Sequence, residues 1–68
     1  MKKVTRATEK YKVIASALNI RKGAGTKYAT IGQVYKQGTI VEVLKLNSGK
    51  TWALTPKGWV CLQYLKKI

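Results

Sequence analysis

The sequence contains no histidine, no aspartate and no phenylalanine, and its only acidic residues are Glu9 and Glu42. General acid–base catalysis at neutral pH usually requires a histidine or a pair of carboxylates with tuned pKa values. Transition-metal sites require several cysteine, histidine or acidic ligands. These absences argue against an enzyme and against a metal site. We therefore expect no catalytic residue, no metal ligand and no cofactor.

Cysteine and long apolar runs are also scarce. Cys61 is the single cysteine, so an intramolecular disulfide is excluded, and without histidine it has no partner for a nucleophilic pair. Met1 is followed by two lysines but by no apolar segment, so a signal peptide is not predicted. No stretch approaches the ~20 apolar residues of a membrane span. We expect a chain made in the cytoplasm, without an export signal or a membrane span.

Length and charge favour a small binding module. A chain of 68 residues forms one domain, and a domain of this size buries only about 60% of the surface that its unfolded form exposes. Little volume is left for an enclosed active site. The formal net charge of +12 favours polyanionic partners. Nucleic acid, anionic phospholipid surfaces and the teichoic acids or glycan carboxylates of a bacterial wall all fit, and composition does not choose among them.

The order of apolar residues and turns predicts an all-β fold. Residues 1–10 are charged and weakly apolar, which indicates a basic linker or tail before a domain at residues 11–68. Strands are expected within 11–21 (two, with a bend near Ser16), 30–35, 39–46, 51–54 and 59–61. A 3₁₀ turn is expected at 62–65, followed by a basic tail. Five to six short strands of this kind favour a small, strongly bent barrel.

Several short motifs, taken in order, resemble one family. The sequence runs LNIRKGAGTKYATIGQVYKQGTIVEVL, then GKTW, then KGWVCLQYL. This order closely resembles the bacterial SH3 (SH3b) family over residues 11–65. The matching positions are Leu18, Asn19, Ile20, Arg21, Ile31, Gly32, Gly38, Trp52, Gly58, Trp59, Val60, Tyr64 and Leu65. The resemblance implies an SH3-like barrel.

The resemblance also implies a function. SH3b modules are appended to wall hydrolases, especially bacteriophage endolysins and bacterial autolysins, and tether them to peptidoglycan. We therefore expect a non-catalytic cell-wall binding module, with peptidoglycan as partner and teichoic acid as a further wall partner. It would act at the wall, after release or as part of a larger protein whose catalytic domain joins it through residues 1–10. Two alternatives stay open: a cytoplasmic SH3-like module that binds nucleic acid, and an adaptor that binds a protein.

Aromatic residues supply most of the candidate ligand-binding positions. Tyrosine and tryptophan combine a large apolar face with a polar edge, which suits a partly exposed contact surface. Trp52 and Tyr64 stand where the resemblance to SH3 domains implies a ligand groove. Tyr28, at the tip of the glycine loop, is expected to form a wall of that groove. Trp59 is expected to be half-buried and mainly structural, whereas Tyr11 and Tyr35 receive no assignment.

Two polar residues complete the candidate site. Asn19 and Arg21 share one parity of an expected strand, whereas Leu18 and Ile20 share the other. Alternation then directs the polar pair outward, to the rim of the groove. The competing interpretation is that Asn19 organises the loop backbone through its amide and that Arg21 packs along the loop.

Overall fold

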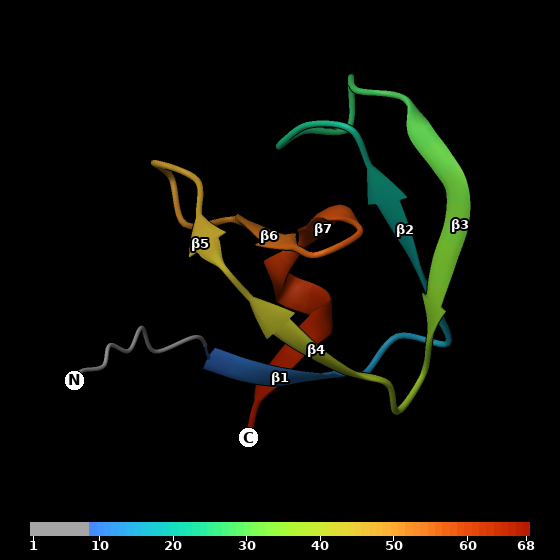
Figure 1. Ribbon diagram of the computed structural model, residues 1–68, viewed down its shortest axis with the longest axis vertical. Coiled ribbons are helices and arrows are strands. Elements are labelled where there is room, and N and C mark those ends of the chain that lie inside the picture. Colours follow the sequence, from blue (N-terminus) through green and yellow to red (C-terminus); the bar gives the residue numbers. More distant parts are fainter. Residues whose placement is uncertain (1–8) are drawn as a thin grey trace, which may run out of the picture.

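The computed structural model describes residues 9–68 (Figure 1). Within them it contains eight strands and one 3₁₀ turn. These are β1 (Glu9–Val13), β2 (Ala17–Arg21), β3 (Thr30–Lys36), β4 (Ile40–Val43), β5 (Lys45–Leu46), β6 (Trp52–Thr55), β7 (Gly58–Cys61), η1 (Leu62–Tyr64) and β8 (Leu65–Lys67). The all-β class and the 3₁₀ turn are confirmed. The strands outnumber the expected five to six because the expected basic tail contributes β8 and because Leu44 separates β4 from β5.

The strands form two antiparallel sheets that enclose one core. The smaller sheet has the order β4-β1-β8, and the larger has the order β3-β2-β7-β6-β5. The chain passes from one sheet to the other at Leu44, whose amide donates to the carbonyl oxygen of Leu54 at 2.7 Å. The sheets curve toward each other as in a small SH3-like barrel (Figure 1).

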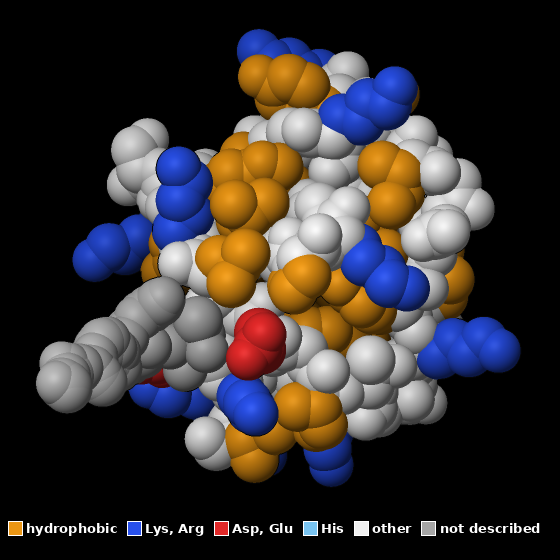
Figure 2. All heavy atoms as spheres, viewed as in Figure 1, with side chains coloured by type: hydrophobic (Ala, Val, Ile, Leu, Met, Phe, Trp, Pro, Cys, Tyr) orange, Lys and Arg blue, Asp and Glu red, His pale blue; other side chains and the backbone are white. Residues whose placement is uncertain are grey.

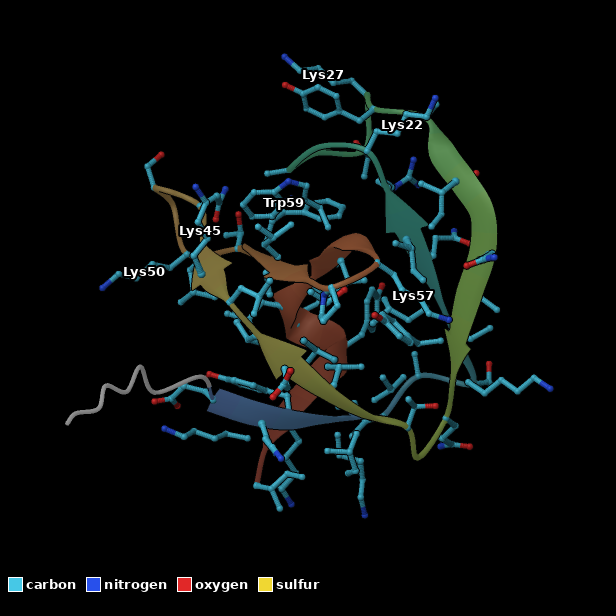
Figure 3. All side chains as sticks on the ribbon, in the orientation of Figure 1. Lys22, Lys27, Lys45, Lys50, Lys57 and Trp59 are labelled. Carbon is cyan, nitrogen blue, oxygen red and sulfur yellow. The ribbon has the colours of Figure 1, made fainter. Side chains whose placement is uncertain are left out.

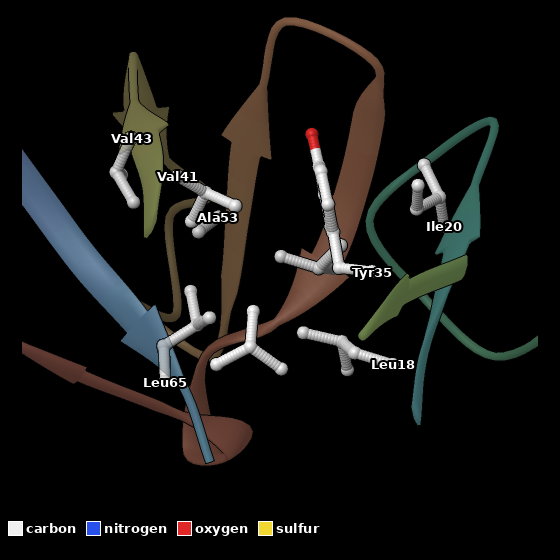
Figure 4. Close-up of a cluster of buried hydrophobic side chains, with 9 residues drawn as sticks. Leu18, Ile20, Tyr35, Val41, Val43, Ala53 and Leu65 are labelled. Atoms are coloured by element: carbon white, nitrogen blue, oxygen red, sulfur yellow. The ribbon is translucent and has the colours of Figure 1, made fainter. Parts of the chain in front are cut away.

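The core follows the alternation that the sequence predicts. Along β2, Leu18 and Ile20 are buried while Asn19 between them is exposed. The buried side chains of both sheets meet in one cluster (Figure 4). Its members are Val13, Leu18, Ile20, Tyr35, Val41, Val43, Ala53, Val60 and Leu65. Tyr35, which the sequence left unassigned, is thus a core residue.

One polar network lies inside this core. The Tyr35 hydroxyl is 2.8 Å from Thr55 Oγ1, and the Thr55 hydroxyl donates to the Gly58 carbonyl oxygen at 2.8 Å. Because a hydroxyl has one proton, Tyr35 donates and Thr55 accepts. The Gly58 amide also donates to Thr55 Oγ1, at 3.3 Å. The network satisfies the buried hydroxyls and holds the β6–β7 turn onto β3.

Two glycines have backbone conformations that the fold requires. Gly32 has a φ of 85° and lies where the β2–β3 register shifts between Asn19 and Arg21, so it forms a bulge in this pair of strands. Gly58 has a φ of 150°. A Cβ atom there would lie 2.8 Å from Ile20 Cγ2 and 2.9 Å from the Arg21 carbonyl oxygen. Gly58 therefore permits β7 to approach β2.

Both ends of the described segment differ from the expectation. β1 begins at Glu9, two residues before the predicted start of the domain, and pairs there with β4. The expected C-terminal tail is instead β8, which pairs with β1. A Lys67–Glu9 ion pair joins these strands, and its hydrogen bond and the Glu9 charge raise the Lys67 pKa. The sequence pattern did not predict β8 or the first two residues of β1, because these residues are mostly charged. The rest of the predicted linker lies outside the described residues.

Candidate functional site

The outer face of the larger sheet presents the candidate residues. Ala53, Thr55 and Val60 of β6 and β7 point into the core. Alternation directs Trp52 and Cys61 to the opposite side, where they are cross-strand partners. Both are half-buried. The outer face is therefore partly apolar, although it lies outside the core.

A groove of about 560 Å³ opens beside this face. It lies between β2, the segment before β2, the glycine loop, β6, β7 and η1. Its lining residues are Ala15, Ala17, Leu18, Asn19, Arg21, Thr26, Trp52, Cys61, Gln63 and Tyr64. Four of the five predicted ligand-binding residues, Asn19, Arg21, Trp52 and Tyr64, are thus brought together from three separate segments.

Trp52 is positioned by Asn47, which lies between β5 and β6. Asn47 Oδ1 accepts hydrogen bonds from the amides of Thr51 at 2.8 Å and Trp52 at 3.0 Å. The Lys50 amide donates to the Asn47 carbonyl oxygen at 3.0 Å, which closes the hairpin, and Lys50 has a φ of 57°. The asparagine side chain therefore fixes the start of β6 and, with it, the backbone of Trp52.

Arg21 holds the glycine loop against the sheet. Its Nη1 donates to the carbonyl oxygens of Thr26 at 3.1 Å and Tyr28 at 2.9 Å. The loop is also closed by the Lys22 amide, which donates to the Ala29 carbonyl oxygen at 3.0 Å. Arg21 thus lines the groove and fixes one of its walls, which combines the two roles considered from the sequence.

Asn19 and Tyr64 are two exposed polar residues of the groove. Both side chains are exposed, Tyr64 at 41%. In the part of the chain that the structure describes, no side-chain hydrogen bond involves the Asn19 amide, so the loop-organising interpretation has no hydrogen bond to support it. The Tyr64 carbonyl oxygen accepts from the Ile14 amide at 3.0 Å, which fixes η1 while the phenol stays exposed.

Tyr28 does not line this groove. Its ring covers Gly23, where a Cβ atom would lie 2.6 Å from the ring. The ring also lies next to Gly25, where a Cβ atom would be 3.5 Å away. Lys27 Nζ lies 5.7 Å from the ring centroid. Tyr28 therefore packs on its own loop, with 43% of its surface exposed. Its role in ligand binding stays a prediction.

The family follows from comparison with known sequences. The sequence model described as bacterial SH3 domain matches residues 16–66. The chain belongs to the bacterial SH3 domain family. Domains of this family commonly serve as binding modules. No curated protein and no solved structure matches the chain.

Sequence analysis missed part of the groove of this bacterial SH3 domain. Thr26, Cys61 and Gln63 line it beside the predicted residues. Cys61 had a detectable signal, since it alternates with the buried Val60 and therefore faces outward. Thr26 and Gln63 lie in a loop and in a 3₁₀ turn, where no simple periodicity indicates side-chain direction.

Trp59 is half-buried, as expected, but its position is not that of a core residue. It belongs neither to the core cluster nor to the half-buried side chains packed against it. Its cross-strand partners are Arg21 on β2 and Leu54 on β6. Trp59 therefore lies on the outer face of the sheet, next to the groove but not in its lining (Figure 3).

The domain contains little that supports other kinds of site. Among residues 9–68, no group of three or more His, Cys, Asp or Glu side chains is placed to hold a metal ion. Within the same segment, no helix has the length and apolar character needed to cross a membrane. Cys61 is a free thiol, half-buried at the edge of the groove.

Proposed function

We propose that this bacterial SH3 domain is a non-catalytic module that binds the peptidoglycan of the bacterial cell wall through the groove. The observation that supports the proposal most directly is the convergence of Trp52, Tyr64, Asn19 and Arg21 on one open groove. The module would deliver the catalytic domain of an endolysin or autolysin to the wall, outside the cytoplasm in which the protein is made.

The groove has the chemistry that a glycan–peptide ligand requires. The Trp52 indole and the Tyr64 phenol offer apolar faces for sugar rings or aliphatic stem-peptide side chains. Asn19 can donate and accept hydrogen bonds, as peptide and acetamido groups require. A contact surface of this size gives weak single contacts, and the repeating lattice of the wall supplies tightness when several modules or domains bind at once.

Asn19→Ala is the sharpest test of the proposal. The side-chain amide of Asn19 makes no hydrogen bond within residues 9–68, so removing that side chain should leave the fold intact. We expect retention on purified Gram-positive walls to fall about tenfold, which corresponds to about 1.4 kcal/mol. Tyr64→Ala should have a similar effect, since only the exposed ring is lost. Sedimentation with walls measures both, and thermal melts confirm folding.

Gln33→Ala is the matched control, because Gln33 is an exposed amide on β3 outside the groove. It should bind walls as the unaltered chain does. The proposal is wrong if Asn19→Ala and Tyr64→Ala, both folded, are retained as well as this control. A gel shift with nucleic acid and no retention on walls would favour the cytoplasmic alternative, and release of reducing sugars from walls would contradict a non-catalytic role.

A further inference from the structure

Trp59 forms part of a row that crosses the larger sheet. Its partner on β6 is Leu54, whose partner on β5 is Lys45, and its partner on β2 is Arg21. Directly opposite residues of antiparallel strands project from the same side of a sheet. Strands lie about 4.8 Å apart, so the Lys45 backbone is about 10 Å from that of Trp59. An indole and a leucine thus lie between two cationic side chains.

Further lysines extend this cationic border. The glycine loop begins directly after Arg21 and includes Lys22 and Lys27, both exposed. In Figure 3 these two lysines lie above Trp59, and Lys45 lies to its left. Figure 2 shows the same face: in its upper half, lysine and arginine side chains lie around apolar ones, and its lower half has further basic side chains together with the acidic ones.

We propose that this surface binds a phosphodiester-linked anionic polymer of the bacterial wall, of the teichoic acid type. The Trp59 surface is defined as Arg21, Lys22, Lys27, Lys45, Leu54 and Trp59. The proposal rests on the proposed function, which places the domain at the wall, and assigns a second site there. Phosphates contact the lysines, and the sugar or alditol carbons between them pack on the indole.

Charge complementarity supports a phosphate polymer. The chain has a net charge of +12, and a lysine ammonium is a mobile point charge that can follow phosphates along a flexible chain. A phosphodiester polymer alternates charge with short apolar units, which matches lysines placed around one indole. The groove, by contrast, contains one cationic residue, Arg21, among its lining residues.

A nucleic acid fits this surface less well. Single-stranded nucleic acids are bound by successive aromatic rings that stack successive bases. The Trp59 surface as defined contains one such ring, because Trp52 lines the groove and one side of the partly exposed Tyr28 ring packs on Gly23 of its own loop. Bidentate reading of a base by arginine needs a free guanidinium, whereas Arg21 Nη1 already donates to two loop carbonyl oxygens.

The two tryptophans allow each site to be observed separately. Trp52→Phe leaves Trp59 as the only indole, and Trp59→Phe leaves Trp52. Each folded variant is titrated with purified poly(glycerol phosphate), with soluble muropeptides and with oligo(dT), and fluorescence is recorded. We expect poly(glycerol phosphate) to change the emission of Trp59 and muropeptides to change that of Trp52. Oligo(dT) should bind at least tenfold more weakly than poly(glycerol phosphate).

Lysine substitutions then test the border. Lys27→Gln/Lys45→Gln should weaken binding of poly(glycerol phosphate) about fivefold per lysine. Lys12→Gln/Lys66→Gln is the matched control, since it removes the same charge from a cross-strand pair on the smaller sheet. Distant charges are screened over about 10 Å at 0.1 M salt, so the control should change the affinity by less than about twofold.

Each outcome decides between specific possibilities. Equal weakening in both double variants would overturn the proposal in favour of nonspecific polyanion attraction. Tight oligo(dT) binding at Trp59 without binding of poly(glycerol phosphate) would replace the wall polymer by a nucleic acid. Failure of muropeptides to affect Trp52, with polymer binding at Trp59 intact, would contradict the proposed function of the groove and leave the second site standing.

Discussion

The β6–β7 hairpin has its small side chains on the inner face and its largest side chains on the outer face, the reverse of the usual arrangement. The inner face has Ala53, Thr55 and Val60, which are buried, and the outer face has Trp52 and Trp59, which are half-buried. Large aromatic residues usually provide core volume, yet both tryptophans lie outside the core cluster. The volume of the core is supplied instead by larger side chains of other strands, including β2 and β3. Each tryptophan therefore keeps part of its surface accessible to solvent.

The largest expected difference between the faces is in stability. Ile20→Ala removes a fully buried side chain on β2, the strand beside β7, and should lower the free energy of unfolding by about 2–5 kcal/mol. Trp59→Ala removes a larger but half-buried side chain and should cost about 2 kcal/mol. Urea unfolding of the two variants measures both. If Trp59→Ala lowered the free energy of unfolding as much as Ile20→Ala, Trp59 would stabilise the domain as a core residue does. The two faces of the hairpin would then not differ in stability.

Asn47→Ala tests how the outer face is organised. It removes the acceptor for the Thr51 and Trp52 amides, so we expect a loss of about 1–2 kcal/mol. Because the start of β6 becomes less ordered, wall retention should also decrease at temperatures where the variant is folded. Asn47→Asp keeps a side-chain oxygen that can accept from the Thr51 and Trp52 amides, so it should retain most of the stability and most of the wall binding. Full binding by a folded Asn47→Ala variant would show that Trp52 is positioned by β6 pairing alone.

Tyr35→Phe tests the inner face with a smaller change. The variant removes the hydroxyl that donates to Thr55 Oγ1, and the threonine keeps its hydrogen bonds with Gly58. We expect a loss of about 1 kcal/mol in a thermal or urea melt, with wall retention unchanged, because neither residue lines the groove. A loss of binding without a loss of stability would connect the inner face to the ligand site.

The smallest effect is expected at the Lys67–Glu9 ion pair, which joins β1 and β8 of the smaller sheet. The raised Lys67 pKa means that the pair stabilises the fold fully below the ordinary lysine pKa of about 10.4. This contribution is lost as the pH rises through the raised value. The difference in stability between the unaltered chain and Lys67→Gln should therefore be constant from neutral pH to about pH 10 and decrease above it. A difference that grows with pH would contradict this sign.

Residues of the candidate site were predictable where strand alternation gives the direction of the side chain. They were not predictable in loops, where no such alternation exists. Asn19 and Arg21 were identified from parity, and Trp52 and Tyr64 from the family resemblance; the structure brings all four together. Tyr28 was assigned to the same groove from its place in a loop. Its ring instead covers Gly23, and no periodic pattern of the sequence specifies that direction.

The sequence by itself determined the fold class and the buried positions of β2, because the alternation of Leu18 and Ile20 with polar neighbours has only one arrangement that buries apolar surface. It also determined the +12 charge and therefore the attraction to polyanions. Only the tertiary structure decided that Trp59 lies between Arg21 and Leu54. That position follows from the pairing of β7 with β2 and β6, which joins residues distant in the chain. Local pattern does not specify such long-range registers, because they depend on how both sheets close around one core.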